Sequence, residues 1–209
     1  MRFLRLGILG SGQGSNFLAL AQAIQEGAIP AEVVQVGSDQ PEAGILKHAK
    51  RLGFPVFVCR ASAFQTKLEP EIEEELAESL SRARVDLVVL AGYMRVVKIP
   101  LLRRFGGRMI NIHPSLLPAF PGLKAWEQAL RAGVQETGCT VHWVNEVVDG
   151  GSVIRQARVP VQAGDTAESL HARIQKAEHR LLPEVVRDLA MGKILWAEDP
   201  RRNGGRRKV

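Results

Sequence analysis

Two polar side chains near the middle of the chain carry groups that could handle an oxyanion and a proton. The segment Met109–Pro114 reads Met-Ile-Asn-Ile-His-Pro, so Asn111 and His113 alternate with isoleucines. Side chains alternate across a β-strand, and both polar groups therefore project from one face. Burying such groups is costly unless they are used or well bonded. The pattern indicates an amide that holds an oxyanion beside an imidazole that moves a proton, with a purely structural histidine as the alternative.

An acidic residue later in the chain could complete this group. Asp149 lies within Val147–Gly151, at the mouth of a glycine turn between two expected strands. An aspartate in an Asp-Gly turn is usually a turn-former, and that alternative stays open. If the fold brings Asp149 beside His113, the carboxylate should raise the pKa of the histidine so that it can donate a proton. We therefore expect a catalytic trio of Asn111, His113 and Asp149.

A glycine-rich segment near the N-terminus has the composition of a phosphate-binding turn. Gly10–Asn16 reads Gly-Ser-Gly-Gln-Gly-Ser-Asn, between an expected strand and an expected helix. Glycines let backbone N–H groups approach an anion, and a helix N-terminus favours a phosphate. No Gly-Lys-Ser/Thr follows, and Ser15 replaces the third glycine of the dinucleotide fingerprint. A single phosphate is the favoured ligand; a dinucleotide, or a tight turn with Ser15 capping the helix, is the alternative.

These residues fall at the ends of elements that the hydrophobic pattern predicts. Strands are expected at 3–9, 32–36, 55–58, 86–90, 108–113, 140–144 and 153–161. Helices are expected at 16–26, 42–52 and 69–78, followed by a long helix with apolar residues from Leu170 to Leu189. The alternation predicts a Rossmann-like, doubly wound α/β fold, whose mostly parallel sheet is covered on both faces. In such sheets ligands bind beyond the carboxyl ends of the strands.

The net charge of +6 over 209 residues is concentrated at one end. Arg201–Val209 holds five lysines and arginines and no acid, so the remaining chain carries a net charge near +1. A basic nucleic-acid-binding fold would spread its charge over a face. We expect one domain over residues 1–199, a solvated, disordered tail at 200–209 and no nucleic-acid partner, with a phosphate-seeking tail as the alternative.

Targeting and redox features predict a cytoplasmic protein. Met1–Leu9 is too short and too interrupted by charge to be the apolar part of a signal peptide, and no apolar run approaches the roughly 18 residues of a membrane helix. Cys59 and Cys139 form no Cys-x-x-Cys pair and are expected to be buried, reduced thiols. No cluster of metal ligands is visible in the sequence, so we expect no bound metal. The absence of a long apolar run leads us to expect no membrane contact.

Two longer motifs identify a family. Asn111–Phe120, Asn-Ile-His-Pro-Ser-Leu-Leu-Pro-Ala-Phe, resembles the signature of folate-dependent formyltransferases. Gly138–Gly151 resembles a second signature of the same family. Together with the glycine turn, these motifs are similar to the branch that acts on glycinamide ribonucleotide. The resemblance covers Phe3 to about Trp196.

The resemblance implies a reaction and a set of site residues. It implies direct transfer of the formyl group of 10-formyltetrahydrofolate, as co-substrate, to the amine of 5-phosphoribosylglycinamide in purine biosynthesis. It implies Asn111, His113 and Asp149 as the catalytic residues. The ribonucleotide-binding residues that it implies are Gly14, Ser15 and Asn16 for the phosphate and Glu178 for the ribose. The folate-binding residues that it implies are Lys67, Met94, Arg95, Val96, Val97 and Asn111. Lys67 stands where many relatives have arginine, which keeps the charge and loses bidentate geometry.

Partners and alternatives follow from the same residues. We expect small-molecule substrates only and a monomer or homodimer. Methionyl-tRNA formyltransferases carry an added C-terminal domain and formyltetrahydrofolate hydrolases an added N-terminal domain, so both are disfavoured. A nicotinamide-dependent oxidoreductase is disfavoured by Ser15. A phosphate-binding regulator that uses the basic tail on nucleic acid is the non-enzyme alternative.

Overall fold

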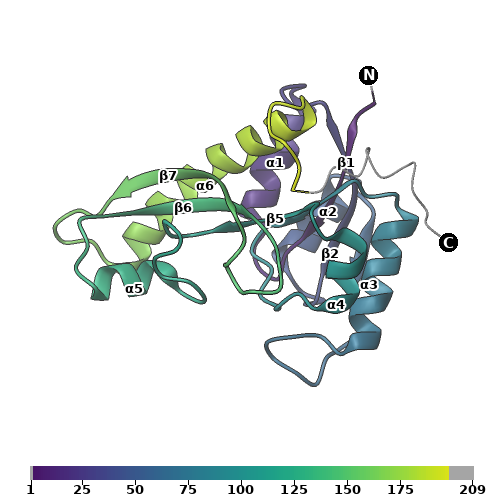
Figure 1. Ribbon diagram of the computed structural model, residues 1–209, viewed down its shortest axis with the longest axis horizontal. Helices are drawn as coiled ribbons and strands as arrows, with labels where there is room; N and C mark the ends of the chain where they lie inside the picture. The colour runs from purple at the N-terminus through teal and green to yellow at the C-terminus, as the bar shows by residue number, and fades with distance from the viewer. Residues whose placement is uncertain (1, 198–209) are drawn as a thin grey trace.

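The computed structural model describes residues 2–197, which form a seven-stranded sheet flanked by helices (Figure 1). The strands are β1 (Leu4–Leu9), β2 (Ala31–Ser38), β3 (Val56–Val58), β4 (Leu87–Leu90), β5 (Met109–His113), β6 (Glu136–Trp143) and β7 (Val153–Pro160). The helices are α1 (Ser15–Gln25), α2 (Gly44–Arg51), α3 (Pro70–Arg82), α4 (Ile99–Phe105), α5 (Ala125–Arg131) and α6 (Ala167–Ala190). The expected basic tail at 200–209 lies outside the described residues.

The sheet has the order β3-β2-β1-β4-β5-β6-β7. Its first five strands are parallel, and β6 and β7 are antiparallel to their neighbours. The mostly parallel α/β sheet predicted from the sequence is thus confirmed. Because β1, β4 and β5 are parallel neighbours, the segments that follow them meet at one edge of the sheet. Antiparallel β6 then pairs directly with β5, and Figure 1 shows β6 and β7 extending together away from the parallel strands.

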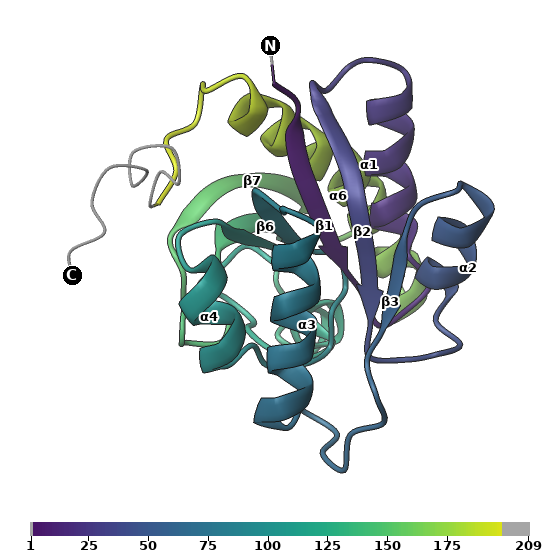
Figure 2. The ribbon, with the colours of Figure 1, turned by 90° about the vertical axis from the view of Figure 1, so that its right-hand side faces the viewer.

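Two hydrophobic cores cover the two faces of the sheet. One core packs α1, α2 and α6 on side chains such as Ile8 and Val89, and the other packs α3 and α4 on Val88 and Leu90. Figure 2 shows α1 and α2 on one side of the sheet and α3 and α4 on the other. Neighbouring residues of β4 therefore serve opposite cores, which explains why Leu87–Leu90 is an unbroken apolar run.

All seven expected strands are present, whereas two helices were not predicted. Helices α4 and α5 have seven residues each, which is too short to display a helical period, and Pro100 lies in the first turn of α4. Cys59 and Cys139 are buried and free, as expected. Within residues 2–197, no helix is long and apolar enough to cross a bilayer.

Candidate active site

The structure brings Asn111, His113 and Asp149 together. Asn111 and His113 lie on β5, and the alternating Ile110 and Ile112 are packed in the core, as the alternation predicted. The connection from β6 to β7 returns Asp149 to this face, where its Oδ2 lies 3.4 Å from Nδ1 of His113. The amide nitrogen of Asn111 lies 3.4 Å from Oδ1 of the same carboxylate. The predicted proximity is confirmed, and the catalytic roles remain a prediction.

His113 is held between two acceptors. Its Nε2 lies 2.9 Å from the carbonyl oxygen of Phe120, while Nδ1 faces Asp149. Burial lowers the pKa of His113, and the Phe120 carbonyl and the Asp149 charge offset only part of that effect. The expected raised pKa was therefore wrong for the ligand-free protein, because the sequence pattern showed the neighbouring charge and not the depth of burial. Both ring nitrogens nevertheless face acceptors, so the site can accommodate a doubly protonated ring.

The loop after β5 fixes the position of the Phe120 carbonyl. The hydroxyl of Thr140 donates to the carbonyl of Ser115 at 2.6 Å, and the hydroxyl of Ser115 donates to the carbonyl of Ala119 at 2.5 Å. Thr140 also accepts the N–H of Leu117 at 3.1 Å. Since Thr140 lies on β6 opposite His113, the sheet itself holds the loop against the imidazole.

Asp149 occupies a backbone conformation that needs external support. Its φ of 52° lies in the left-handed region, and its Oδ2 accepts the N–H of Gly122 at 2.8 Å. Burial would raise the pKa of Asp149, but the nearby imidazoles of His142 and His113 and the hydrogen bond from the N–H of Gly122 lower it overall. Asp149 is therefore an oriented carboxylate, although its positive φ also suits a turn.

His142 is a member of this cluster that the sequence reasoning missed. Its Nε2 lies 3.1 Å from the amide nitrogen of Asn111 and 3.6 Å from Oδ1 of Asp149. Its Nδ1 lies 2.9 Å from the Trp143 carbonyl, so a neutral ring carries its proton there and Nε2 accepts from Asn111. The signal was weak, because His142 lies in a largely buried strand whose register against Asn111 follows only from the antiparallel pairing. Among residues 2–197, no group of three or more His, Cys, Asp or Glu is placed to hold a metal ion.

Gly151 allows this arrangement by a close backbone approach. A Cβ atom at Gly151 would lie 1.7 Å from the carbonyl oxygen of Trp143, the oxygen that Nδ1 of His142 contacts. Any side chain at Gly151 would displace the strand beside His142. Gly151 is thus a packing requirement of the site.

The glycine turn (Gly10–Asn16) ends at the start of α1. Gly14 is the N-cap residue, with φ +82°, and no side chain in the described part of the chain caps the helix. The alternative in which Ser15 caps the helix was wrong, because Ser15 is already the first helical residue. N–H groups of a first helical turn have no intrahelical acceptor, so this turn can present them to an anion.

Asn16 and Glu178 meet beside the glycine turn. The amide nitrogen of Asn16 donates to Oε2 of Glu178 at 2.9 Å, joining α1 to α6, and the two residues are 9 % and 5 % exposed. Burial raises the pKa of Glu178 to about 7, and the hydrogen bond from Asn16 opposes this effect. Because the side-chain amide of Asn16 donates to Glu178, the backbone N–H of Asn16 is the group left to bind a phosphate.

The 94–97 loop (Met94–Val97) follows β4 between the glycine turn and β5. Met94 is exposed, whereas Val97 is buried in the core beneath α3 and α4. The guanidinium of Arg95 points inward, with Nε 2.6 Å from Oδ2 of Asp39. This loop therefore offers mainly backbone groups and the Met94 side chain to a ligand. The backbone N–H of Val96 donates to the carbonyl of Thr66, which ties the 94–97 loop to the segment that carries Lys67.

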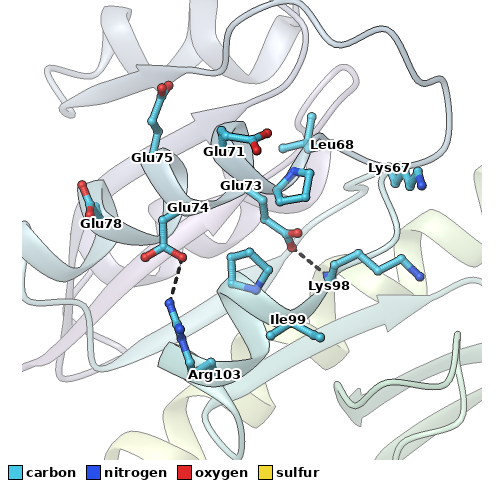
Figure 3. Close-up of a pocket in the computed structure, with 12 residues that line it drawn as sticks. Lys67, Leu68, Glu71, Glu73, Glu74, Glu75, Glu78, Lys98, Ile99 and Arg103 are labelled. Atoms are coloured by element: carbon cyan, nitrogen blue, oxygen red, sulfur yellow. Dashed lines mark hydrogen bonds and ion pairs between the residues drawn. The ribbon is translucent and has the colours of Figure 1, made fainter.

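Lys67 is exposed, and its Nζ lies 4.4 Å from the centroid of the Phe64 ring. It also borders a groove of about 700 Å³ between α3 and α4 (Figure 3). Glu73 accepts the backbone N–H of Lys98 at 2.7 Å, a bond that fixes the start of α4 and is drawn as a dashed line in Figure 3. Neither His113 nor Asp149 lines this groove, so it is separate from the candidate catalytic cluster.

Comparison with known proteins identifies the family. The model of the formyl transferase family matches residues 4–186. Phosphoribosylglycinamide formyltransferase of Bacillus subtilis is 39% identical over 88% of this chain and 94% of its own length. The crystal structure of glycinamide ribonucleotide transformylase 1 from Symbiobacterium toebii superposes with a TM-score of 0.88 at 46% identity, covering 93% of this chain and 91% of that one.

A longer relative contains a similar segment. The trifunctional purine biosynthetic protein adenosine-3 of Drosophila melanogaster is 45% identical over 91% of this chain, which spans only 14% of that protein's length. The family match covers most of the chain and includes both the glycine turn and the candidate catalytic cluster. This chain belongs to the formyl transferase family.

Proposed function

We propose that this chain transfers the formyl group of 10-formyltetrahydrofolate to the primary amine of 5-phosphoribosylglycinamide, a step of de novo purine biosynthesis. The main support is the position of the Asn111–His113–Asp149 cluster at the same sheet edge as an uncapped glycine turn. The Asn111–His113–Asp149 cluster at this edge suits the chemistry of a formyl group, and the glycine turn suits a phosphate. The names of the B. subtilis and S. toebii relatives support the same reaction.

The ribonucleotide would bind along the start of α1. The N–H groups of Gly14, Ser15 and Asn16 would hold the phosphate, because the helix N-terminus supplies donors and a partial positive charge. Glu178 would accept a hydrogen bond from a ribose hydroxyl. Its position beside Asn16 keeps the ribose contact next to the phosphate contact.

The folate would bind against the 94–97 loop. Backbone groups of this loop would pair with the pterin ring, and Met94 would supply apolar contact. Lys67 would approach the acidic tail of the folate as a single positive charge. Asn111 would contact the formyl group at the inner end of this pocket.

The chemistry would use the cluster without a covalent enzyme intermediate. The substrate amine attacks the formyl carbon, and the formyl oxygen becomes an oxyanion that Asn111 and His113 stabilise. Negative charge at that oxygen raises the pKa of His113, so the ring can hold its second proton at that stage. Asp149 balances the resulting imidazolium. His113 and Asp149 then pass the proton lost by the attacking amine to the folate nitrogen, as the oxyanion returns to a carbonyl and the bond between the formyl carbon and the folate nitrogen breaks.

We propose that residues 1–199 act as a single catalytic domain, because one continuous sheet and the helices and loops connected to it carry every candidate residue. A cytoplasmic location, small-molecule substrates and a monomer or homodimer complete the proposal. Two buried free cysteines are consistent with a reducing compartment.

A comparison of formyl acceptors tests the proposed reaction. The purified chain is mixed with 10-formyltetrahydrofolate, and formation of tetrahydrofolate is followed by absorbance with glycinamide ribonucleotide, with methionyl-tRNA or with buffer alone. We expect turnover only with glycinamide ribonucleotide. Equal turnover in buffer would indicate a hydrolase, and turnover with methionyl-tRNA would assign a different acceptor.

A further inference from the structure

A buried ionic network joins the segments that follow three neighbouring parallel strands. Ser11 follows β1, Asp39 follows β2 and Arg95 follows β4, at the carboxyl edge of the sheet. Ser11 belongs to the glycine turn, and Arg95 belongs to the 94–97 loop. Asp39 belongs to neither segment and contacts both.

The contacts in this network are short and shielded from water. The Ser11 hydroxyl donates to Oδ1 of Asp39 at 2.5 Å, and Nε of Arg95 donates to Oδ2 at 2.6 Å. The side chains of Arg95 and Asp39 are only 9% and 2% exposed. Burial would raise the pKa of Asp39, but hydrogen bonds from Ser11, Arg95 and Gln40 lower it overall. Asp39 is therefore a fixed anion. One of its carboxylate oxygens accepts a hydrogen bond from the glycine turn, and the other accepts one from the 94–97 loop.

The backbone completes the connection. The N–H of Met94 donates to the Ser11 hydroxyl at 2.8 Å, and the N–H of Ser11 donates to the carbonyl of Gly92 at 2.9 Å. A second nitrogen of Arg95 donates to the carbonyl of Phe64. Movement of the glycine turn would therefore disturb Met94 directly, and would disturb Arg95 through Asp39.

A buried ion pair of this kind contributes little net stability, because desolvation offsets much of the Coulomb attraction. What it provides is a defined geometry, since removing one partner leaves the other charge unpaired. Here the defined geometry is the position of the glycine turn relative to the 94–97 loop.

We propose that Asp39 is a positioning residue that couples the two substrate sites, so that ordering the glycine turn with the ribonucleotide also orders the 94–97 loop for the folate. This inference rests on the proposed function, which assigns one ligand to each segment. Such coupling is reciprocal, and typical values change each affinity by roughly 5- to 150-fold. Without the Asp39 charge, the route through Arg95 is lost and the Ser11 hydroxyl that accepts the Met94 N–H is no longer held by Asp39, so the coupling between the two ligands should largely disappear.

The test is a binding measurement without turnover. The dissociation constant of tetrahydrofolate, the reaction product, is measured by calorimetry with and without saturating glycinamide ribonucleotide. For the wild type we expect at least about fivefold tighter binding in the presence of the ribonucleotide. In Asp39→Asn, which keeps the shape but removes the charge, this ratio should fall close to one. Turnover with both substrates saturating should remain within about threefold of the wild type, with the loss appearing in KM.

Two further variants control the test. Ser11→Ala leaves the Asp39–Arg95 pair intact and removes only the hydroxyl that links the two loops. It should therefore also lose the coupling. This variant decides the case if Asp39→Asn does not fold. Asp188→Asn breaks a more exposed pair with Arg155, 2.9 Å apart at the far end of α6, and should keep the wild-type ratio.

Four outcomes decide the inference. Loss of the ratio in Asp39→Asn and Ser11→Ala, but not in Asp188→Asn, supports it. A wild-type ratio in both loop variants overturns it, as does independent binding of the two ligands to the wild type. If the wild type binds neither ligand, the proposed function fails and the coupling fails with it.

Discussion

Replacing Glu178 with glutamine should stabilise the protein at alkaline pH and not at acidic pH. Glu178 is 5% exposed and receives one hydrogen bond, from Asn16 at 2.9 Å. Glutamine has nearly the same shape and can accept that bond through Oε1, but it never ionises. The variant therefore removes the cost of burying a negative charge and changes little else.

The size of the effect follows from the pKa of Glu178. Burial raises this pKa from 4.5 to about 7 in the folded protein, so the folded state binds the proton more tightly than the unfolded chain. The stabilising contribution is fully present below pH 4.5 and is lost as the pH rises through 7. One pKa unit corresponds to about 1.4 kcal/mol, so wild type should lose roughly 2–3 kcal/mol relative to Glu178→Gln between pH 5 and pH 8.

The assay is urea unfolding of both proteins at several pH values, followed by tryptophan fluorescence. Subtracting the two free energies of unfolding at each pH cancels the titration of all other groups. As a control, Glu184→Gln on the same helix removes a carboxylate whose side chain is half exposed, and should change stability by less than about 0.5 kcal/mol. A wild-type-minus-variant difference that is the same at pH 5 and pH 8 would refute the argument from burial.

Three further predictions concern the active site. Asp149→Asn should lower the pKa of His113 further, seen by NMR titration of the ring, and should lower kcat by roughly 100-fold or more; an unchanged kcat and pH profile would leave Asp149 as a turn residue only. Gly151→Ala should destabilise the protein by more than about 2 kcal/mol in chemical denaturation, because its Cβ would lie 1.7 Å from the Trp143 carbonyl, and a wild-type midpoint would contradict the close approach. Lys67→Ala should raise KM for the folate several-fold without changing KM for the ribonucleotide, and equal changes in both would contradict its placement.

Part of the fold could be predicted because its signals are local. The run Leu87–Leu90 predicts a buried strand on its own, and the Gly10–Asn16 pattern predicts a strand-to-helix turn. The two seven-residue helices could not be found in this way, since so few residues do not display a period. The antiparallel pairing of β6 with β5 was not predicted either, and without that register His142 could not be placed beside Asn111.

The electrostatics of the site depended on information that the sequence lacks. Placing Asp149 near His113 correctly predicts an attraction, but the burial that lowers the histidine pKa arises from residues distant in sequence. Arg95 was expected to be one of the folate-binding residues. Its guanidinium pairs with Asp39, because the edge of the sheet brings the end of β2 beside the 94–97 loop, and this pairing could not be predicted from the sequence.

Glycine variants are poor probes of the ribonucleotide site. Gly14 has φ +82°, and a Cβ there would lie 2.7 Å from Cα of Ile45 in α2. A substitution such as Gly14→Val would therefore strain the fold whether or not a phosphate binds. The Kd ratio of the coupling experiment avoids this problem, since it compares two ligand states of the same variant.

The most direct test of the proposed reaction is a single-turnover transfer of a labelled formyl group. Enzyme in excess over 10-formyltetrahydrofolate, labelled in the formyl carbon, is mixed with glycinamide ribonucleotide and sampled over time, beside His113→Asn. We predict that the label moves directly from folate to the ribonucleotide amine with no protein-bound label, and that His113→Asn slows this transfer by roughly 100-fold or more. Release of the label as free formate, or an unchanged rate in His113→Asn, would contradict formyl transfer by the Asn111–His113–Asp149 cluster.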